Sequence, residues 1–361
     1  MTNKSLNVCV IGGGIFGLTI ALHLSKYCKS IKVFESNSNI LNGATKFNHN
    51  RHHFGFHYPR SIDTARQCLD AIKDFNRYYK NSIDYSFQNY YAISKRNSKI
   101  DYSYFEKFCN KIGLNFKEIQ TPNYVFNESK ISKCYLVKEG VYNFNKIKSI
   151  ILKRLRDKKN IRLIKNSSIK GFVDIDKTII LRKNNRMIEE KFDLIINATY
   201  SNLNNHIYYM KNKLLMEYNL QEMCKLKIHG KRFGSTVLDG EFPSILPVAG
   251  SKNEYLFAHV KFSQLIKKVS KKIPNEILNE KYVSNLNKTF NESKKYLNVL
   301  NKSKIIGSFK VIRSVNVDSQ KDSRKSEIIQ HKNGNFSIFS GKIITVENLA
   351  KKITKLINLQ F

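Results

Sequence analysis

The chain has 361 residues, of which 41 % are hydrophobic and 12 % aromatic, and its formal net charge is +35. This composition supports a packed core and excludes a globally disordered chain, and the length allows two core-bearing domains or one large interwoven unit. A positive field attracts anionic substrates. The lysines are spread evenly and no basic block stands apart, however, so nucleic acid is not the favoured partner.

The N-terminal segment and the cysteines indicate the compartment. No stretch approaches the roughly 20 apolar residues of a membrane span, and the first residues show no secretory pattern. The six cysteines include no Cys-x-x-Cys pair, so no metal site is predicted, and free thiols suit a reducing compartment. We therefore expect a cytoplasmic protein without a membrane span.

The chain opens with the pattern strand, glycine turn, helix, strand. Residues 6–11 are almost continuously apolar, as in a buried parallel strand, and residues 15–26 place apolar side chains at helical spacing. A second strand, 31–34, ends at Glu35. A polar, histidine-rich loop over 36–60 follows, and loops of that length are usually functional.

The remaining elements alternate between helical and β patterns. Helices are predicted over 61–79, 102–112, 143–154, 281–300 and 345–357. Strands are predicted over 90–93, 161–164, 169–173, 178–181, 192–197, 304–313, 327–330 and 336–339, and residues 213–260 are mostly β. Similar segments are interleaved along the chain, which indicates two domains that each use several pieces of it.

The glycine turn at residues 12–17, Gly-Gly-Gly-Ile-Phe-Gly, matches the pattern G-x-G-x-x-G. It follows a predicted strand and opens a predicted helix, and Glu35 lies about 20 residues further on, which is the context of a dinucleotide-binding fingerprint. Gly12 permits the tight turn, Gly14 lets backbone N–H groups approach a pyrophosphate, and Gly17 lets the helix pack closely. The Glu35 carboxylate can accept hydrogen bonds from ribose hydroxyls. The motif leaves open whether the dinucleotide is FAD or NAD.

Four segments together resemble the D-amino-acid-oxidase-like superfamily of FAD-dependent oxidoreductases. The first is the fingerprint through Glu35. The second, residues 43–45 and 48–58, is similar to the flavin loop of L-2-hydroxyglutarate dehydrogenase-like members, with Asn48 and His53 at the positions of an asparagine and a histidine that pass over the flavin. The third, 193–199, resembles a strand and loop at the dinucleotide end, although Tyr200 stands where the family usually has a glycine. The fourth, 340–345, resembles a turn whose backbone amides face the flavin pyrimidine.

The resemblance implies an α/β fold with a Rossmann-type FAD-binding domain and an interleaved α+β substrate domain built on a mainly antiparallel sheet. We expect the FAD-binding domain to comprise residues 1–85, 138–212 and 304–361. The substrate domain is expected to comprise residues 86–137 and 213–303.

FAD is the cofactor that the resemblance implies. Reduced flavin is anionic at N1 and C2=O, where a glycine turn at a helix N-terminus offers N–H donors and a positive dipole, and Lys342 either adds charge or points to solvent. The residues expected to hold FAD are Gly12, Gly14, Ile15, Phe16, Gly17, Glu35, Ser36, Thr45, Asn48, Arg51, His52, Ala198, Thr199, Gly341, Lys342, Ile343 and Ile344.

Histidines in the loop are the candidates for a general base, which oxidation of an alcohol requires. His53 is the first choice, with His52 and His57 as alternatives. An extended segment would place His53 and His57 on one face and His52 on the other. These histidines could instead be structural or bind the pyrophosphate, and His49 or His52 could attach the flavin covalently.

Arginine is the natural bidentate partner of a carboxylate or phosphate. Arg313, in the strand 309–313, is expected to contact substrate; the alternative is a surface salt bridge. Arg51, Arg60 and Arg324 are further basic candidates. Two residues on a β-like run, His259 and Tyr255, are additional candidates for the pocket wall.

The function predicted from these residues is an FAD-dependent dehydrogenase or oxidase. It would remove a hydride from a C–H bond next to OH or NH of a small anionic substrate, such as a 2-hydroxy acid, an amino acid or a sugar-linked compound. The alternatives are an oxidase that acts on a tRNA-base adduct and a non-catalytic flavoprotein. The sequence does not identify the electron acceptor.

Overall fold

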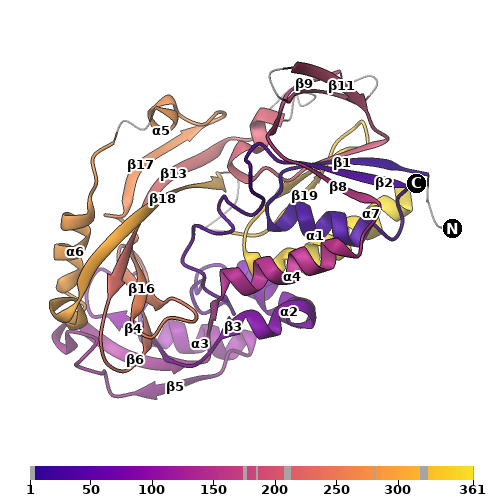
Figure 1. The fold of residues 1–361 in the computed structure, drawn as a ribbon. Helices are drawn as coiled ribbons and strands as arrows, with labels where there is room; N and C mark the ends of the chain where they lie inside the picture. Colours follow the sequence, from indigo (N-terminus) through magenta and orange to yellow (C-terminus); the bar gives the residue numbers. More distant parts are fainter. Residues whose placement is uncertain are drawn as a thin grey trace.

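Two main sheets organise the protein in the computed structural model, which describes residues 5–173, 177–183, 186–206, 213–279, 282–317 and 324–360. The expected domain boundary at residue 212 falls outside these ranges. A six-stranded sheet lies at the right of Figure 1, and a nine-stranded sheet lies at the left.

The six-stranded sheet is parallel except at one edge, where β19 and β20 are antiparallel. The glycine turn follows β1. This strand lies between two parallel neighbours, is buried on both faces and is nearly all apolar. In spatial order the strands are β19 (Glu327–Gln330), β20 (Phe336–Phe339), β12 (Leu194–Asn197), β1 (Asn7–Ile11), β2 (Ser30–Phe34) and β8 (Ile161–Ile164).

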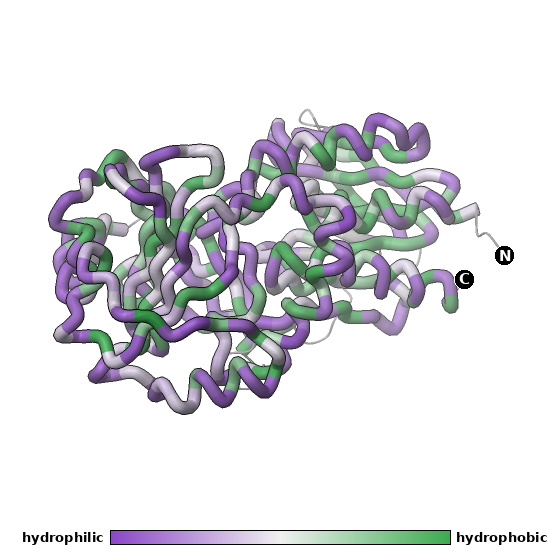
Figure 2. The backbone as a smooth tube through the Cα atoms, turned by 90° about the horizontal axis from the view of Figure 1, so that it is seen from below, coloured by the Kyte–Doolittle hydropathy of each residue, from purple (hydrophilic) through white to green (hydrophobic). Residues whose placement is uncertain are grey.

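Helices cover one face of this sheet and a smaller sheet covers the other (Figure 1). The helices are α1 (Ile15–Leu24), α2 (Ile62–Tyr79), α4 (Phe144–Arg156) and α7 (Val346–Gln360). The smaller sheet contains β9 (Ser167–Val173), β10 (Thr178–Lys183) and β11 (Arg186–Lys191). Almost every residue of α1 is buried, whereas α2, α4 and α7 are amphipathic, as the alternation of green and purple along the helices in Figure 2 illustrates.

The nine-stranded sheet is antiparallel except where β14 runs parallel to β4. Its order is β17 (Gln264–Ser270), β13 (Met216–Lys227), β16 (Glu254–His259), β15 (Pro243–Pro247), β14 (Phe233–Leu238), β4 (Gln88–Ser94), β6 (Ile131–Val137) and β5 (Phe116–Ile119), and β18 (Lys304–Asn316) also pairs with β13. The remaining elements are β3 (Ile83–Asp84), β7 (Val141–Tyr142), α3 (Tyr102–Ile112), α5 (Asn275–Leu278), α6 (Leu286–Lys294) and five 3-10 turns: η1 (Lys80–Ser82), η2 (Glu128–Lys130), η3 (Tyr200–His206), η4 (Asn298–Lys302) and η5 (Ile343–Thr345).

The architecture confirms the predicted fold class, a Rossmann-type parallel sheet combined with a mainly antiparallel one. One segment differs from expectation. β18 pairs with β13 along its length and so lies in the nine-stranded sheet, although residues 304–361 were expected in the FAD-binding domain. An alternating strand pattern predicts a strand without saying which sheet it joins, because the pairing partner is nearly a hundred residues away. Among the described residues, no helix is long and apolar enough to cross a membrane.

Candidate functional site

The glycine turn between β1 and α1 opens onto a large cavity. Gly12 has a φ of +108°, and a Cβ there would lie 2.6 Å from the carbonyl oxygen of Ala198. At Gly17 a Cβ would lie 2.1 Å from the carbonyl oxygen of Gly12, so the close packing of α1 on the turn requires glycine. Gly14 differs, because the nearest atom to its Cβ position is Thr45 Oγ1 at 3.7 Å. The protein therefore leaves open space above Gly14.

Glu35 closes one end of the turn. Its Oε2 accepts a hydrogen bond from the Gly13 amide at 2.9 Å, and its Oε1 accepts from the amide and side chain of Asn37, both at 2.8 Å. The Ser36 hydroxyl also donates to Oε1, at 3.3 Å. The carboxylate therefore fixes the glycine turn relative to the end of β2, and it lines the cavity beside Ser36.

The cavity has a volume of about 1420 Å³ and reaches from Glu35 to the nine-stranded sheet. Both predicted catalytic residues, His53 and Arg313, line it, together with Gly12, Gly14, Ile15, Phe16, Glu35, Ser36, Thr45, Asn48, Arg51, Ala198, Thr199, Gly341, Lys342 and Ile343. Three residues expected to hold the cofactor lie outside this lining: Gly17, His52 and Ile344. Gly17 packs against the turn, and Ile344 is buried in the hydrophobic core between sheet and helices.

The loop after Glu35 presents alternate histidines to opposite sides. The rings of His53 and His57 both line the cavity, with centroids 5.9 Å apart. His52 points the other way, into a buried cluster with Phe54, Phe75 and Tyr142. The predicted division of the histidines between two faces is thus observed. The same alternation removes His52 from the cavity wall.

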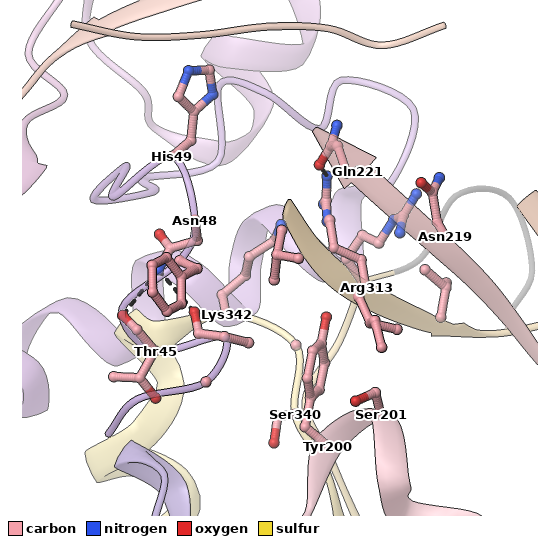
Figure 3. A pocket seen from close by; sticks show the side chains of 18 of the residues that line it. Thr45, Asn48, His49, Tyr200, Ser201, Asn219, Gln221, Arg313, Ser340 and Lys342 are labelled. Carbon is pink, nitrogen blue, oxygen red and sulfur yellow. Dashed lines mark hydrogen bonds between the residues drawn. The ribbon is translucent and has the colours of Figure 1, made fainter. Parts of the chain in front are cut away.

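The neighbouring Asn48 shapes this loop. Its Nδ2 donates to the carbonyl oxygens of Ala44 and Thr45, at 2.9 and 3.0 Å, and its Oδ1 accepts from the Asn50 amide at 2.6 Å. Figure 3 shows Asn48 beside Thr45, with His49 beyond it toward the nine-stranded sheet. There His49 Nε2 lies 2.9 Å from the Leu256 carbonyl oxygen, to which it donates. The asparagine side chain therefore holds the loop conformation.

Burial keeps the cavity histidines neutral. It lowers the pKa of His53 well below its usual value, and the charges of Lys342 and Arg51 lower it further. The pKa of His57 is lowered well below its usual value by burial and by the same two cations. The Nδ1 atoms of both rings have no hydrogen-bond partner among the described residues. Neutral imidazoles with free nitrogen atoms can accept or donate a hydrogen bond to a bound molecule.

Three basic side chains also line the cavity: Lys342, Arg313 and Arg324. In the described part of the chain, none of them forms an ion pair with a carboxylate. Glu217, which also lines the cavity, pairs with Lys267 at 3.0 Å. Burial and the two arginines hold the pKa of Lys342 well below its usual value.

Strand pairing places polar side chains beside Arg313. The register of β13 and β18 puts Asn219 opposite Arg313, and one guanidinium nitrogen donates to Gln221 Oε1 at 2.8 Å. Figure 3 shows the three side chains together on the sheet, across the cavity from Ser340. The Asn219 Oδ1 atom is buried and has no partner among the described residues. Lys342 completes this end of the cavity, with its Nζ 4.7 Å from the centre of the Tyr58 ring.

The turn at Gly341 differs from the expected arrangement. The amides of Gly341 and Lys342 both donate to Ser326 Oγ, at 2.8 and 3.3 Å, rather than facing the cavity. Gly341 is needed because a Cβ there would lie 2.2 Å from the carbonyl oxygen of Arg324. The glycine thus allows two chain segments to pack closely, and two amides of the turn that was expected to face the flavin already have a partner within the protein.

Tyr200 stands at the position where the resembling family usually has a glycine. It has a φ of +54°, and its side chain enters the cavity beside Ser340 (Figure 3). Its hydroxyl oxygen accepts a hydrogen bond from the Ser314 amide at 3.3 Å, next to Arg313. The tyrosine therefore helps to define the cationic end of the cavity.

Three residues were not predicted from the sequence: Asn219, Gln221 and Glu139, which pairs with Arg51. None of them lies in a motif, and the first two reach the site only through the pairing of β13 with β18. His259 and Tyr255 are buried outside the cavity lining.

Comparisons with known proteins agree with this geometry. A family model described as "DAO: FAD dependent oxidoreductase" matches residues 7–203. A curated relative, the FAD-dependent monooxygenase FPY4 of Fusarium mangiferae, is 32 % identical over 109 residues, which is 30 % of this chain and 30 % of that protein. The matched stretch therefore spans less than a third of the relative's length.

Solved structures share the whole fold. Glycine oxidase from Geobacillus kaustophilus superposes with a TM-score of 0.70 at 11 % identity, covering 97 % of this chain and 94 % of that one. L-proline dehydrogenase from P. horikoshii also gives a TM-score of 0.70, at 15 % identity, covering 98 % and 94 %.

Proposed function

Because the chain belongs to the DAO family of FAD-dependent oxidoreductases, we propose that it oxidises a small anionic substrate at a C–H bond next to an amine or a hydroxyl group. The solved structures of similar fold are named for oxidation of the amino acids glycine and proline, which supports an amine-bearing substrate. The histidine pair in the cavity supports an alcohol equally well.

The cavity fits FAD at its other end. Open space above Gly14 at the start of α1 suits a pyrophosphate, which favours the positive end of a helix, and Glu35 is placed to accept from a ribose hydroxyl. The unpartnered Nδ1 atoms of His53 and His57 suit polar atoms of a ring system. When bound, FAD supplies the hydride acceptor of the reaction.

The cluster of Lys342, Arg313 and Arg324 is the observation that supports an anionic substrate most strongly. These three basic side chains are half-buried and have no carboxylate partner among the described residues, and burial and the two arginines hold the pKa of Lys342 down. A bound anion would relieve the repulsion among them. Arg313 offers a planar fork for a carboxylate, and Gln221 holds one arm of it in place. The Asn219 amide lies beside this fork and can orient a second polar atom of the substrate.

His53 is the proposed proton acceptor for an alcohol substrate. Its neutral ring can take the hydroxyl proton as the hydride leaves, and the charge formed on it would be temporary because burial and Lys342 oppose it. An amine substrate can react from its neutral form without such a base. The dependence on His53 therefore distinguishes the two substrate classes.

An anaerobic screen tests the proposal. Hydroxy acids, amino acids and sugar-linked acids are mixed with the purified protein, and loss of the flavin band is followed. The proposal expects bleaching by one acidic compound. His53→Ala should then slow bleaching roughly 100-fold or more for an alcohol, and little for an amine, without releasing flavin. His52→Phe is the matched control, since His52 lies outside the cavity. Failure of every anionic compound to bleach the flavin would refute the proposed function.

A further inference from the structure

A buried ion pair joins Arg51, which lines the cavity with the histidines, to Glu139, which lies outside the cavity lining. The Glu139 side chain is fully buried and that of Arg51 is 3 % exposed, and their charged atoms are 3.0 Å apart. Glu139 lies in the short connection between β6 and β7 and belongs to no sequence motif. Such a pair is costly to bury, so it needs a structural or functional reason.

The Arg51 guanidinium also ties the loop to the nine-stranded sheet. It donates to the hydroxyl groups of Tyr91 on β4 and of Thr236 on β14, the latter at 2.7 Å. These two residues are direct neighbours in the register of β4 and β14. The Tyr91 hydroxyl in turn donates to Glu139. The guanidinium is therefore held on three sides by protein groups.

The backbone of the loop is fixed by the same short segment. The His52 amide donates to the Gly140 carbonyl oxygen at 2.9 Å, and Tyr142 donates to the Asn50 carbonyl oxygen at 2.6 Å. The Phe54 amide donates to the second oxygen of Glu139, at 2.9 Å. The amides on both sides of His53, those of His52 and Phe54, therefore donate to Gly140 and Glu139.

We propose that Glu139 is a positioning residue: by holding Arg51 and the Phe54 amide, it fixes residues 50–57 against the nine-stranded sheet and sets the places of His53 and His57 in the cavity. This inference rests on the proposed position of the flavin ring beside these histidines. It requires the cofactor but no particular substrate.

Glu139→Gln separates the two contacts of the carboxylate. Glutamine can still accept from the Phe54 amide, but its NH2 group cannot accept from Arg51, so a buried charge loses its partner. We expect about tenfold weaker FAD binding and a changed visible circular dichroism spectrum of the bound flavin. The matched control is Glu222→Gln. Glu222 is similarly buried and, like Glu139, lies outside the cavity lining, but it accepts its three hydrogen bonds from Ser284, Asn285 and Ser308, none of which belongs to the histidine-bearing loop.

A double-mutant cycle with R51M keeps the test decisive even if E139Q folds poorly, since the double variant contains no unpaired buried charge. In the R51M background, E139Q should change FAD affinity less than about twofold, because the group it positions is already absent. Equal effects of E139Q with and without R51M would overturn the proposal, as would identical flavin spectra for E139Q and E222Q. A wild-type protein that binds FAD but oxidises nothing refutes the proposed function alone.

Discussion

Replacing His52 with phenylalanine should remove part of the acid sensitivity of the fold. His52 is completely buried among Phe54, Phe75 and Tyr142, and neither ring nitrogen has a hydrogen-bond partner among the described residues. Burial lowers its pKa from 6.5 to about 3. The folded state therefore keeps this ring neutral at pH values where the unfolded chain would protonate it.

The size of the effect follows from linkage. The folded pKa lies below the unfolded value, so the unfolded state gains a proton first as the pH falls, and stability is lost below about pH 6.5. At pH 5 the unfolded chain gains about 2 kcal/mol from this proton, whereas the folded state gains almost nothing, because its pKa is about 3. For a chain of 361 residues, a loss of that size lowers the melting temperature by about 3 °C.

Thermal unfolding of the wild type and of His52→Phe between pH 8 and pH 5 measures this loss of stability on acidification. The difference in melting temperature between the two proteins at pH 8 reports any change in packing. The difference between their slopes of melting temperature against pH reports the protonation of His52 in the unfolded chain. We expect the variant to lose about 3 °C less than the wild type on acidification and to keep its FAD. Parallel curves would show that His52 is not a neutral buried group. Loss of FAD would show that it does contact the cofactor.

The glycine turn and the cationic end give three further predictions. Gly17→Ala should destabilise the protein by about 2 kcal/mol even without FAD, as measured by urea unfolding, because its Cβ would overlap the Gly12 carbonyl oxygen. Gly14→Ala should keep wild-type stability but bind FAD at least about tenfold more weakly by fluorescence titration, since its Cβ fills only the space for the ligand. Equal losses of unfolding free energy in Gly14→Ala and Gly17→Ala would contradict these separate roles. Binding of a substrate acid should raise the depressed pKa of Lys342, so Lys342 should take up a proton on binding. Calorimetry in two buffers of different ionisation enthalpy should then give different binding heats. Equal heats would count against this role of Lys342.

The sequence predicts best where the site is built from neighbours in the chain. The turn at Gly12–Gly17 and Glu35 could be placed because a strand, a turn and a helix follow each other directly. The opposite directions of His52 and His53 could be predicted from alternation in an extended segment. In each case local geometry alone decides where the side chain points.

Residues brought together by distant pairing could not be predicted. Gln221 and Asn219 meet Arg313 because β13 pairs with β18, and a strand pattern does not specify its partner or register. Glu139 has no sequence signature, since a single acid between two strands gains its role only when Arg51 is folded against it. The backbone amides of the turn at residues 340–345 were expected to face the flavin, but two of them, those of Gly341 and Lys342, donate to the Ser326 hydroxyl.

In the proposed function, the preference of the protein for an anionic substrate depends on Arg313. Anaerobic reduction of the bound FAD is measured with the active acid and with its uncharged methyl ester, in the wild type and in Arg313→Met. We expect the wild type to prefer the acid about 100-fold, because the contact is charge-assisted, and the variant to lose this preference. An unchanged preference for the acid in Arg313→Met would contradict the proposed anion site.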